Sequence, residues 1–399
     1  MQAARFMVEG HSGGMDATFV QMGVIAAAYL VAVAATPIAS WIVGQGRSVG
    51  RDEGLDGMRG AAAVAVVGCH LNQYMCAFLG YTNPFIGDHL GILAVQLFFA
   101  LTGYLFTDRA IIGRIDPFAF YVNRMRRILP LYVFVVITAL AIALSYSWKT
   151  VAPLDHTLRE ALSVLAFGLW KSDELWFRGI NMLSLVGIAW TLSYEWAFYM
   201  ILIPALLLWR CGALVRVCMA LVVSAFLFRD FYFNSEQVIW PFFLPGIVAA
   251  LLKHRRPWWL GGVCVAVVVP SVLLIIWVPG FWTPVKLALA TLVFFAVIFG
   301  RPRCLSWAPL QTLGMISYSI YLVQYLVLYP SVRLIYTSPA LASVEARLGM
   351  GIVIALATII LSAVTYRFVE RPWLTGLRST VAPVNSSSVE LPGIREEAL

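Results

Sequence analysis

The chain has 399 residues, of which 61% are hydrophobic and only 12% are charged. Its mean hydropathy is +0.84. A soluble domain is about 45–50% apolar and about 25% charged, and a single core stops growing beyond about 250–300 residues. The composition therefore excludes a soluble enzyme, a disordered chain and a fibrous repeat. The six cysteines form no CxxC pair, which argues against a disulfide framework and a metal site.

Apolar runs of about 20 residues are long enough to cross a bilayer. They predict an all-α polytopic membrane protein with about 10–11 transmembrane helices in one bundle. A shorter piece, Glu160–Trp170, is expected to be interfacial or re-entrant. The predicted spans are Phe19–Val43, Gly57–Leu79, Leu90–Phe106, Ile128–Ser147, Ile188–Trp209, Val217–Phe233, Val238–Leu252, Trp258–Val278, Val285–Phe299, Thr312–Tyr329 and Leu348–Phe368.

The net charge of +8 does not indicate a nucleic-acid partner, because the Lys and Arg residues gather in short loops between apolar runs. The basic residues fall in alternate loops, such as the one with Arg47 and Arg51. The positive-inside rule then places the N-terminus outside and the C-terminus in the cytoplasm. We expect the protein to lie in the cytoplasmic (inner) membrane. Residues 1–51 are expected to be an extra transmembrane segment and loop, and residues 379–399 a disordered cytoplasmic tail.

The first polar cluster combines Asp56, Arg59 and His70 in one predicted span. Arg59 and His70 differ by about 20° around a helix and lie about 16 Å apart along its axis. Asp56 is three residues before Arg59, where an ion pair can form. Polar groups inside a span usually face a cavity, so this pattern favours a functional imidazole near the middle of the membrane. The alternatives are a structural histidine that donates to a backbone carbonyl, and an Arg59 that only fixes topology.

The second cluster has Arg124 and Arg127 three residues apart at the cytoplasmic entry to the next span. Two guanidinium groups on one helix face suit phosphate groups. Lipid headgroups or a purely topological role would explain the same residues.

The third cluster places Glu195 among aromatic residues near the outer end of a span. A desolvated carboxyl of this kind suits proton transfer or hydrogen bonding. A structural ion pair with an arginine elsewhere in the chain is the alternative.

This combination resembles the membrane-bound acyltransferase 3 family, which includes bacterial sugar and polysaccharide O-acetyltransferases. The resemblance runs from about Asp52 to Trp373 and suggests an acyltransferase 3-like membrane domain over residues 52–378. The stretches that carry it, in the order of the family, are Gly54–Gly60 with His70, Leu97–Leu105, Phe120–Pro130, Trp190–Trp196, Leu313–Leu322 and Glu370–Pro372.

The resemblance implies an Arg-ten residues-His motif at Arg59 and His70, and an Arg-two residues-Arg motif at Arg124 and Arg127. Family members are thought to take an acyl group, usually acetyl, from cytoplasmic acyl-CoA and to place it on a hydroxyl of a glycan or another acceptor. Arg124 and Arg127 would then hold the phosphates of CoA, and Arg59 would help to position the donor. No metal is implied.

His70 would act as a general base toward the acceptor hydroxyl or would carry the acyl group itself, and the sequence does not separate these two mechanisms. Glu195 and Asp56 are the other candidate catalytic residues. A lipid or a macrolide-like small molecule is an alternative acceptor. A glycan or lipid transporter with a proton relay through His70 and Glu195 is an alternative of a different class.

The chain departs from the family pattern at two positions. Gln96 stands where the family often has an acidic residue, and Gln324 stands where it commonly has a histidine. The sequence also has an extra span before the core, and it shows no appended esterase-like domain of the kind found in some members.

Overall fold

The computed structural model describes residues 14–44, 52–78, 85–111, 117–150, 153–169, 175–209, 211–233, 238–253, 260–341 and 343–375. The predicted tail at 379–399 and the loop with Arg47 and Arg51 lie outside the described residues. The α-helices are α1 (Gly14–Val43), α2 (Glu53–Phe78), α3 (Phe85–Ile111), α4 (Pro117–Tyr146), α5 (Leu154–Ala166), α6 (Leu183–Val186), α7 (Trp190–Trp209), α8 (Ala213–Phe233), α9 (Leu244–Leu252), α10 (Leu260–Trp277), α11 (Pro284–Phe295), α12 (Ala308–Met315), α13 (Ser317–Thr337), α14 (Val344–Thr365) and α15 (Arg371–Thr375).

Shorter elements connect these helices. Two strands, β1 (Trp176–Phe177) and β2 (Ile180–Asn181), form an antiparallel pair in which Trp176 lies opposite Asn181. The short 3-10 and π turns are η1 (Gly187–Ala189), η2 (Trp240–Phe243), η4 (Ala296–Gly300), η5 (Arg303–Ser306), η6 (Pro339–Leu341) and η7 (Tyr366–Glu370).

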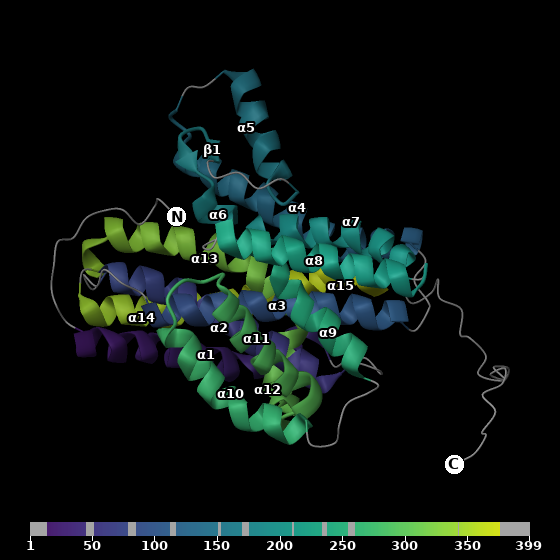
Figure 1. Ribbon diagram of the computed structural model, residues 1–399. Coiled ribbons are helices and arrows are strands. Elements are labelled where there is room, and N and C mark those ends of the chain that lie inside the picture. Colours follow the sequence, from purple (N-terminus) through teal and green to yellow (C-terminus); the bar gives the residue numbers. More distant parts are fainter. Residues whose placement is uncertain are drawn as a thin grey trace, which may run out of the picture.

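Most of the long helices run roughly along one direction, with α10 oblique to them, and α1 starts at one end of the bundle while α15 lies at the other (Figure 1). Helices occupy most of the described residues of every predicted span, which confirms an all-α polytopic membrane protein. Among the described residues, five helices are long and apolar enough to cross a membrane, or up to six if one bent pair counts as a span. The count of 10–11 spans stays a prediction, because α9, α10 and α11 are shorter and α2 and α8 do not meet this test.

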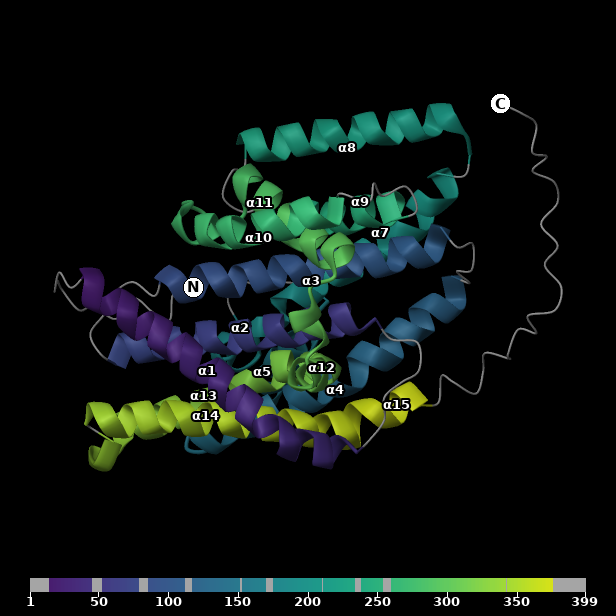
Figure 2. The same ribbon diagram turned by 90° about the horizontal axis from the view of Figure 1, so that it is seen from below.

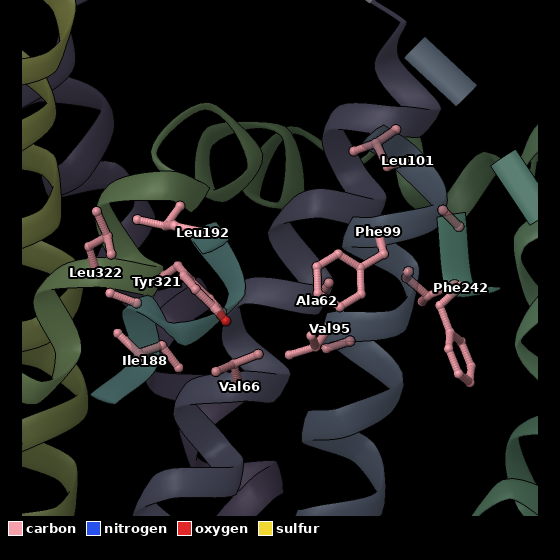
Figure 3. Close-up of a cluster of buried hydrophobic side chains, with 14 of the residues drawn as sticks. Ala62, Val66, Val95, Phe99, Leu101, Ile188, Leu192, Phe242, Tyr321 and Leu322 are labelled. Atoms are coloured by element: carbon pink, nitrogen blue, oxygen red, sulfur yellow. The ribbon is translucent and has the colours of Figure 1, made fainter. Parts of the chain in front are cut away.

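Helix α2 lies inside the bundle, in contact with α1, α3, α12, α13 and α14. Its Ala62 and Val66 pack with Val95 and Phe99 of α3 and with Tyr321 of α13 in the main buried cluster (Figure 3). By contrast, α8 lies at the edge of the molecule (Figure 2), and no described residue of α8 is buried. Asn72 of α2 is fully buried, and Asp56, Arg59 and His70 are partly buried.

Glycines allow α2 and α12 to touch through their backbones. A Cβ atom added at Gly314 of α12 would overlap the carbonyl oxygen of Asp56, and one added at Gly60 of α2 would overlap the carbonyl oxygen of Leu310. Small residues permit this close approach in membrane bundles, where dispersion contacts drive helix association. The contact fixes the end of α2 that carries Asp56 and Arg59.

The predicted span at Thr312–Tyr329 is formed by a bent pair of helices that together are long and apolar enough to cross a membrane. The chain breaks at Ile316, and α12 and α13 are bent by 70° relative to each other. Hydropathy does not reveal such a bend, because apolar residues continue through it. The close contact of Gly314 with α2 holds α12 in its orientation, and α13 starts afresh at Ser317.

The short apolar piece predicted at Glu160–Trp170 forms α5, which has 13 residues and is too short to span a membrane. With β1 it lies to one side of the bundle, at the top of Figure 1. The hydroxyl of Tyr132 in α4 donates to the carbonyls of Val164 and Leu165 and accepts from the amide of Gly168. These bonds tie the C-terminal end of α5 to the middle of α4.

Replacing Gly314 with alanine should destabilise the bundle, because the new methyl group forces α12 away from the Asp56 carbonyl. Overpacking of this kind costs about 1–3 kcal/mol. Gly349→Ala on α14 is the matched control, since a Cβ at Gly349 meets nothing within 4 Å. Thermal unfolding of the purified protein in detergent should show a lower midpoint for Gly314→Ala only. Equal midpoints for the two variants would contradict the backbone contact.

Candidate active site

Four of the predicted site residues converge on one pocket, which we call the arginine pocket. Its charged lining residues are Arg59 of α2, Arg124 and Arg127 of α4, and Glu195 of α7. Its empty space is about 800 Å³ when the open solvent at its mouth is included. The other lining residues are Val95, Phe98, Phe99, Leu101, Thr102, Leu105, Phe106, Ile128, Thr191, Leu192, Tyr199, Ser317, Tyr318 and Tyr321.

Arg59 lies 3.8 Å from Asp56, measured between Nη1 and Oδ1, as the three-residue spacing predicts. The side chain of Asp56 is 14% exposed and does not line the arginine pocket. Asp56 is therefore placed to orient Arg59, and the structure gives it no contact with the pocket interior.

Arg127 is held by a carboxylate that the sequence did not reveal as its partner. Its Nη1 lies 3.4 Å from Oε1 of Glu370, whose side chain is fully buried. The hydroxyl of Ser319 in α13 donates to the other oxygen of Glu370 at 3.0 Å. Glu370 belongs to the Glu370–Pro372 stretch of the family resemblance, which does not point to Arg127. The sequence feature that indicates an ion pair is a carboxylate at the end of an apolar span, because a charge at that position needs a cationic partner.

Arg124 has a different environment. Its guanidinium lies over the ring of Phe106, 4.7 Å from the ring centroid. Among the described residues, no carboxylate lies within 4.0 Å of Arg124, and its buried Nε has no hydrogen-bond partner. A buried cation without a close anion is costly. This side chain is therefore the one in the pocket best suited to an anionic ligand.

Glu195 lines the same pocket as the three arginines, whereas the sequence placed it near the opposite, outer end of its span. Its side chain is fixed by its own helix. The hydroxyl of Tyr199, one turn further along α7, donates to Oε2 of Glu195 at 3.0 Å. Tyr199 itself lines the pocket, and its ring contacts Phe106 edge to face at 5.3 Å. The lining thus holds three arginines and one carboxylate, and two of these arginines are paired with carboxylates outside the lining, Asp56 and Glu370. The first residues of α13, Ser317 and Tyr318, add the positive end of a helix dipole.

His70 is not among the residues that line the arginine pocket. It is partly exposed, and its Nδ1 lies 3.0 Å from Oε1 of Gln324. The ring of Tyr325 lies 4.7 Å away, between centroids. Gln324 is one turn of α13 beyond Tyr321, which does line the pocket and donates to Thr191 Oγ1 at 3.1 Å. His70 therefore contacts α13 one turn beyond the residue of that helix that lines the pocket.

Gln96 also lies outside the arginine pocket. Its side-chain amide donates to the carbonyl of Phe281 at 2.7 Å, and the residue is buried. It therefore anchors the turn between α10 and α11. Within the described part of the chain, no group of three or more His, Cys, Asp or Glu residues could hold a metal ion.

Removing the carboxylate of Glu370 should destabilise the protein, because Arg127 would keep a buried charge. Breaking a buried ion pair from one side costs about 3–5 kcal/mol. We expect Glu370→Leu to lower the thermal midpoint in detergent strongly, and the Glu370→Leu/Arg127→Leu double variant to recover part of the loss. Glu345→Leu, at the exposed start of α14, is the control. A double variant as unstable as the sum of the two single variants would contradict the pairing.

Comparison with known proteins gives the family. A family model described as an acyltransferase domain, that of acyltransferase 3, matches residues 52–367. The chain is 23% identical over 365 residues to the O-acetyltransferase OatA of Staphylococcus aureus, with 80% of this chain and 56% of OatA covered. It is 28% identical over 193 residues to the acyltransferase MdmB of Streptomyces mycarofaciens, with 43% of this chain and 46% of MdmB covered.

The chain thus spans about half the length of these curated relatives. No solved structure matches it significantly. The family model covers most of the chain and includes every residue of the arginine pocket. The protein therefore belongs to the acyltransferase 3 family of membrane enzymes.

Proposed function

We propose that this protein is a membrane O-acyltransferase that moves an acyl group, acetyl in the simplest case, from acyl-CoA to a hydroxyl of a carbohydrate. The acceptor would be an exopolysaccharide, a lipopolysaccharide or an oligosaccharide. The observation that carries the proposal is the convergence of Arg59, Arg124 and Arg127 on one pocket within the helix bundle. Guanidinium groups bind phosphate groups with paired, charge-assisted hydrogen bonds. CoA presents such phosphates, and a neutral transport substrate does not.

The donor would bind with its phosphates at the arginines. Arg124 would make the main contact, because no described carboxylate lies within 4.0 Å of it. Arg127 would be oriented by Glu370, and Arg59 by Asp56. The pantetheine arm would pass along the apolar wall formed by Val95, Phe98 and Leu192, toward the level of Tyr321.

His70 would be the general base for the acceptor hydroxyl, and an acyl-histidine intermediate is the second possible mechanism. Its position one turn of α13 beyond the pocket supports a role at the reacting end of the donor. Glu195 would assist from within the pocket, through its bond with Tyr199. Asp56 would act only through Arg59.

The positive-inside pattern supports a cytoplasmic arginine pocket, with the N-terminus outside and the C-terminus in the cytoplasm of an inner-membrane protein. Acyl-CoA would then enter from the cytoplasm, and the acceptor would meet the acyl group at or across the membrane. The names of the relatives support acyl transfer and, for OatA, transfer to oxygen. The domain limits at 52 and 378 and the extra segment at 1–51 remain part of this proposal.

Labelled acetyl transfer tests the proposed reaction directly. Inside-out vesicles that contain the protein should consume acetyl-CoA labelled in the acetyl group and should pass the label to a glycan fraction. Vesicles with His70→Ala should lose this transfer by about 10²- to 10⁴-fold, which is the usual contribution of a general base.

Label on lipid or on a small molecule would instead identify the alternative acceptors. Equal results for the two vesicle sets, with a broad panel of acyl donors, would contradict an acyltransferase that depends on His70. If a substrate then crossed the membrane without an acyl donor, at a rate that depends on the membrane potential, a transporter would be favoured.

Arg124→Leu should weaken donor binding. A charge-assisted hydrogen bond contributes about 1.5–3 kcal/mol, so KM for acetyl-CoA should rise roughly 10- to 150-fold. Arg124→Lys should recover part of the loss, because it keeps the charge without the planar fork. Arg303→Gln, at an exposed arginine of η5, is the control and should leave KM unchanged. An unchanged KM in Arg124→Leu would remove Arg124 from the donor site.

A further inference from the structure

Gln324 is a buried amide of α13, 2% exposed, with a defined bond at each end. Its Nε2 donates to the backbone carbonyl of Tyr321 at 2.9 Å. Its Oε1 lies 3.0 Å from Nδ1 of His70. These two bonds fix which way the amide points, because a backbone carbonyl can only accept and so must face the NH₂ end.

The fixed amide determines where the imidazole of His70 carries its hydrogen. An amide oxygen cannot donate, so the bond at 3.0 Å requires a hydrogen on Nδ1 of His70. In a neutral imidazole the other nitrogen, Nε2, then keeps its lone pair. The ring of Tyr325, the next residue of α13, lies 4.7 Å from the imidazole and limits its rotation. Two adjacent residues of one helix therefore hold both the tautomer and the plane of the ring.

We propose that Gln324 is a positioning residue that keeps His70 in the Nδ1–H tautomer, so that Nε2 is the basic nitrogen presented to the acceptor hydroxyl. The proposal rests on the function proposed above. Gln324 would not touch either substrate and would act only through His70.

The acyl-transfer step balances with this assignment. Nε2 of His70 takes the hydrogen of the acceptor hydroxyl while the hydroxyl oxygen bonds to the carbonyl carbon of the thioester. The carbon–sulfur bond breaks, and the sulfur of CoA leaves with the electron pair. The hydrogen on Nε2 then passes to this sulfur, which leaves free CoA, an ester and a neutral imidazole. Oε1 of Gln324 accepts from Nδ1–H throughout and stabilises the transient imidazolium.

Other titratable groups near His70 are already engaged. Asp88 of α3 accepts from Nε2 of Gln73 at 2.7 Å and faces the thiol of Cys69. Tyr74 lies one turn after His70 on α2. Tyr325 of α13 offers His70 its ring. Within the described part of the chain, the polar side chain bonded to the imidazole is that of Gln324.

Two variants of the same residue separate the positioning role from simple packing. Gln324→Leu keeps the volume but removes the acceptor, so kcat should fall by about tenfold or more with KM for acetyl-CoA unchanged. Gln324→Glu keeps the acceptor and adds a negative charge that stabilises the protonated imidazole. Activity should therefore survive at high pH and should be lost on acidification from a higher pH than in the unsubstituted protein. Gln311→Leu, on α12, is the matched control and should change neither property.

A measurement without substrate keeps the proposal testable if a variant folds poorly or if acyl transfer fails. Nitrogen-15 NMR of histidine-labelled protein in detergent, with His70→Ala to assign the signal, reports which nitrogen carries the hydrogen. We expect Nδ1–H in the unsubstituted protein and a loss of this preference in Gln324→Leu. Hydrogen on Nε2 in the unsubstituted protein, or an unchanged tautomer and kcat in Gln324→Leu, would overturn the proposal. An Nδ1–H tautomer in a protein that transfers no acyl group would instead defeat the proposed function alone.

Discussion

The constraint on which this structure depends is the cost of placing guanidinium groups inside an apolar bundle, where each charge needs compensation from the protein or from a ligand. The ion pair between Arg127 and Glu370 joins α4 to the end of α14 and η7, and Ser319 connects the same carboxylate to α13. Arg59 has its compensation within α2, from Asp56. Arg124 has an aromatic face and no described carboxylate within 4.0 Å, so the pocket retains a capacity for an anion.

Helix α13 connects the charged pocket to the imidazole. The bend at Ile316 lets this helix begin at the pocket, where Tyr318 donates to the Ile128 carbonyl at 2.9 Å. One turn later Tyr321 lines the pocket, and the next turn holds His70 through Gln324. A straight helix through residues 312–329 would not permit both the glycine contact of α12 with α2 and this path of α13. The break is therefore part of the site and not a defect in a span.

The helical membrane fold and the four charged residues of the pocket could be predicted from the sequence. Polar residues are rare in apolar runs, because placing them in lipid costs free energy, and the few that occur are therefore easy to recognise. It did not find Glu370 as the partner of Arg127, since an ion pair between distant segments leaves no local pattern. The helical-wheel argument placed Arg59 and His70 on one face of α2, yet a wheel does not say which neighbour covers that face. Here α13 covers it at His70. Gln324 was noted only as a departure from the family pattern, and its bond to His70 became visible only once α13 was placed.

A structure of the protein with a non-transferable acetyl-CoA analogue, solved in lipid nanodiscs, tests the central claim most directly. The account predicts CoA phosphates within hydrogen-bond distance of Arg124, with Arg127 still paired to Glu370. It also predicts the acetyl end of the analogue on the side of Tyr321, pointing toward Nε2 of His70. Phosphates bound away from the arginine pocket, or an acetyl group remote from His70, would contradict it.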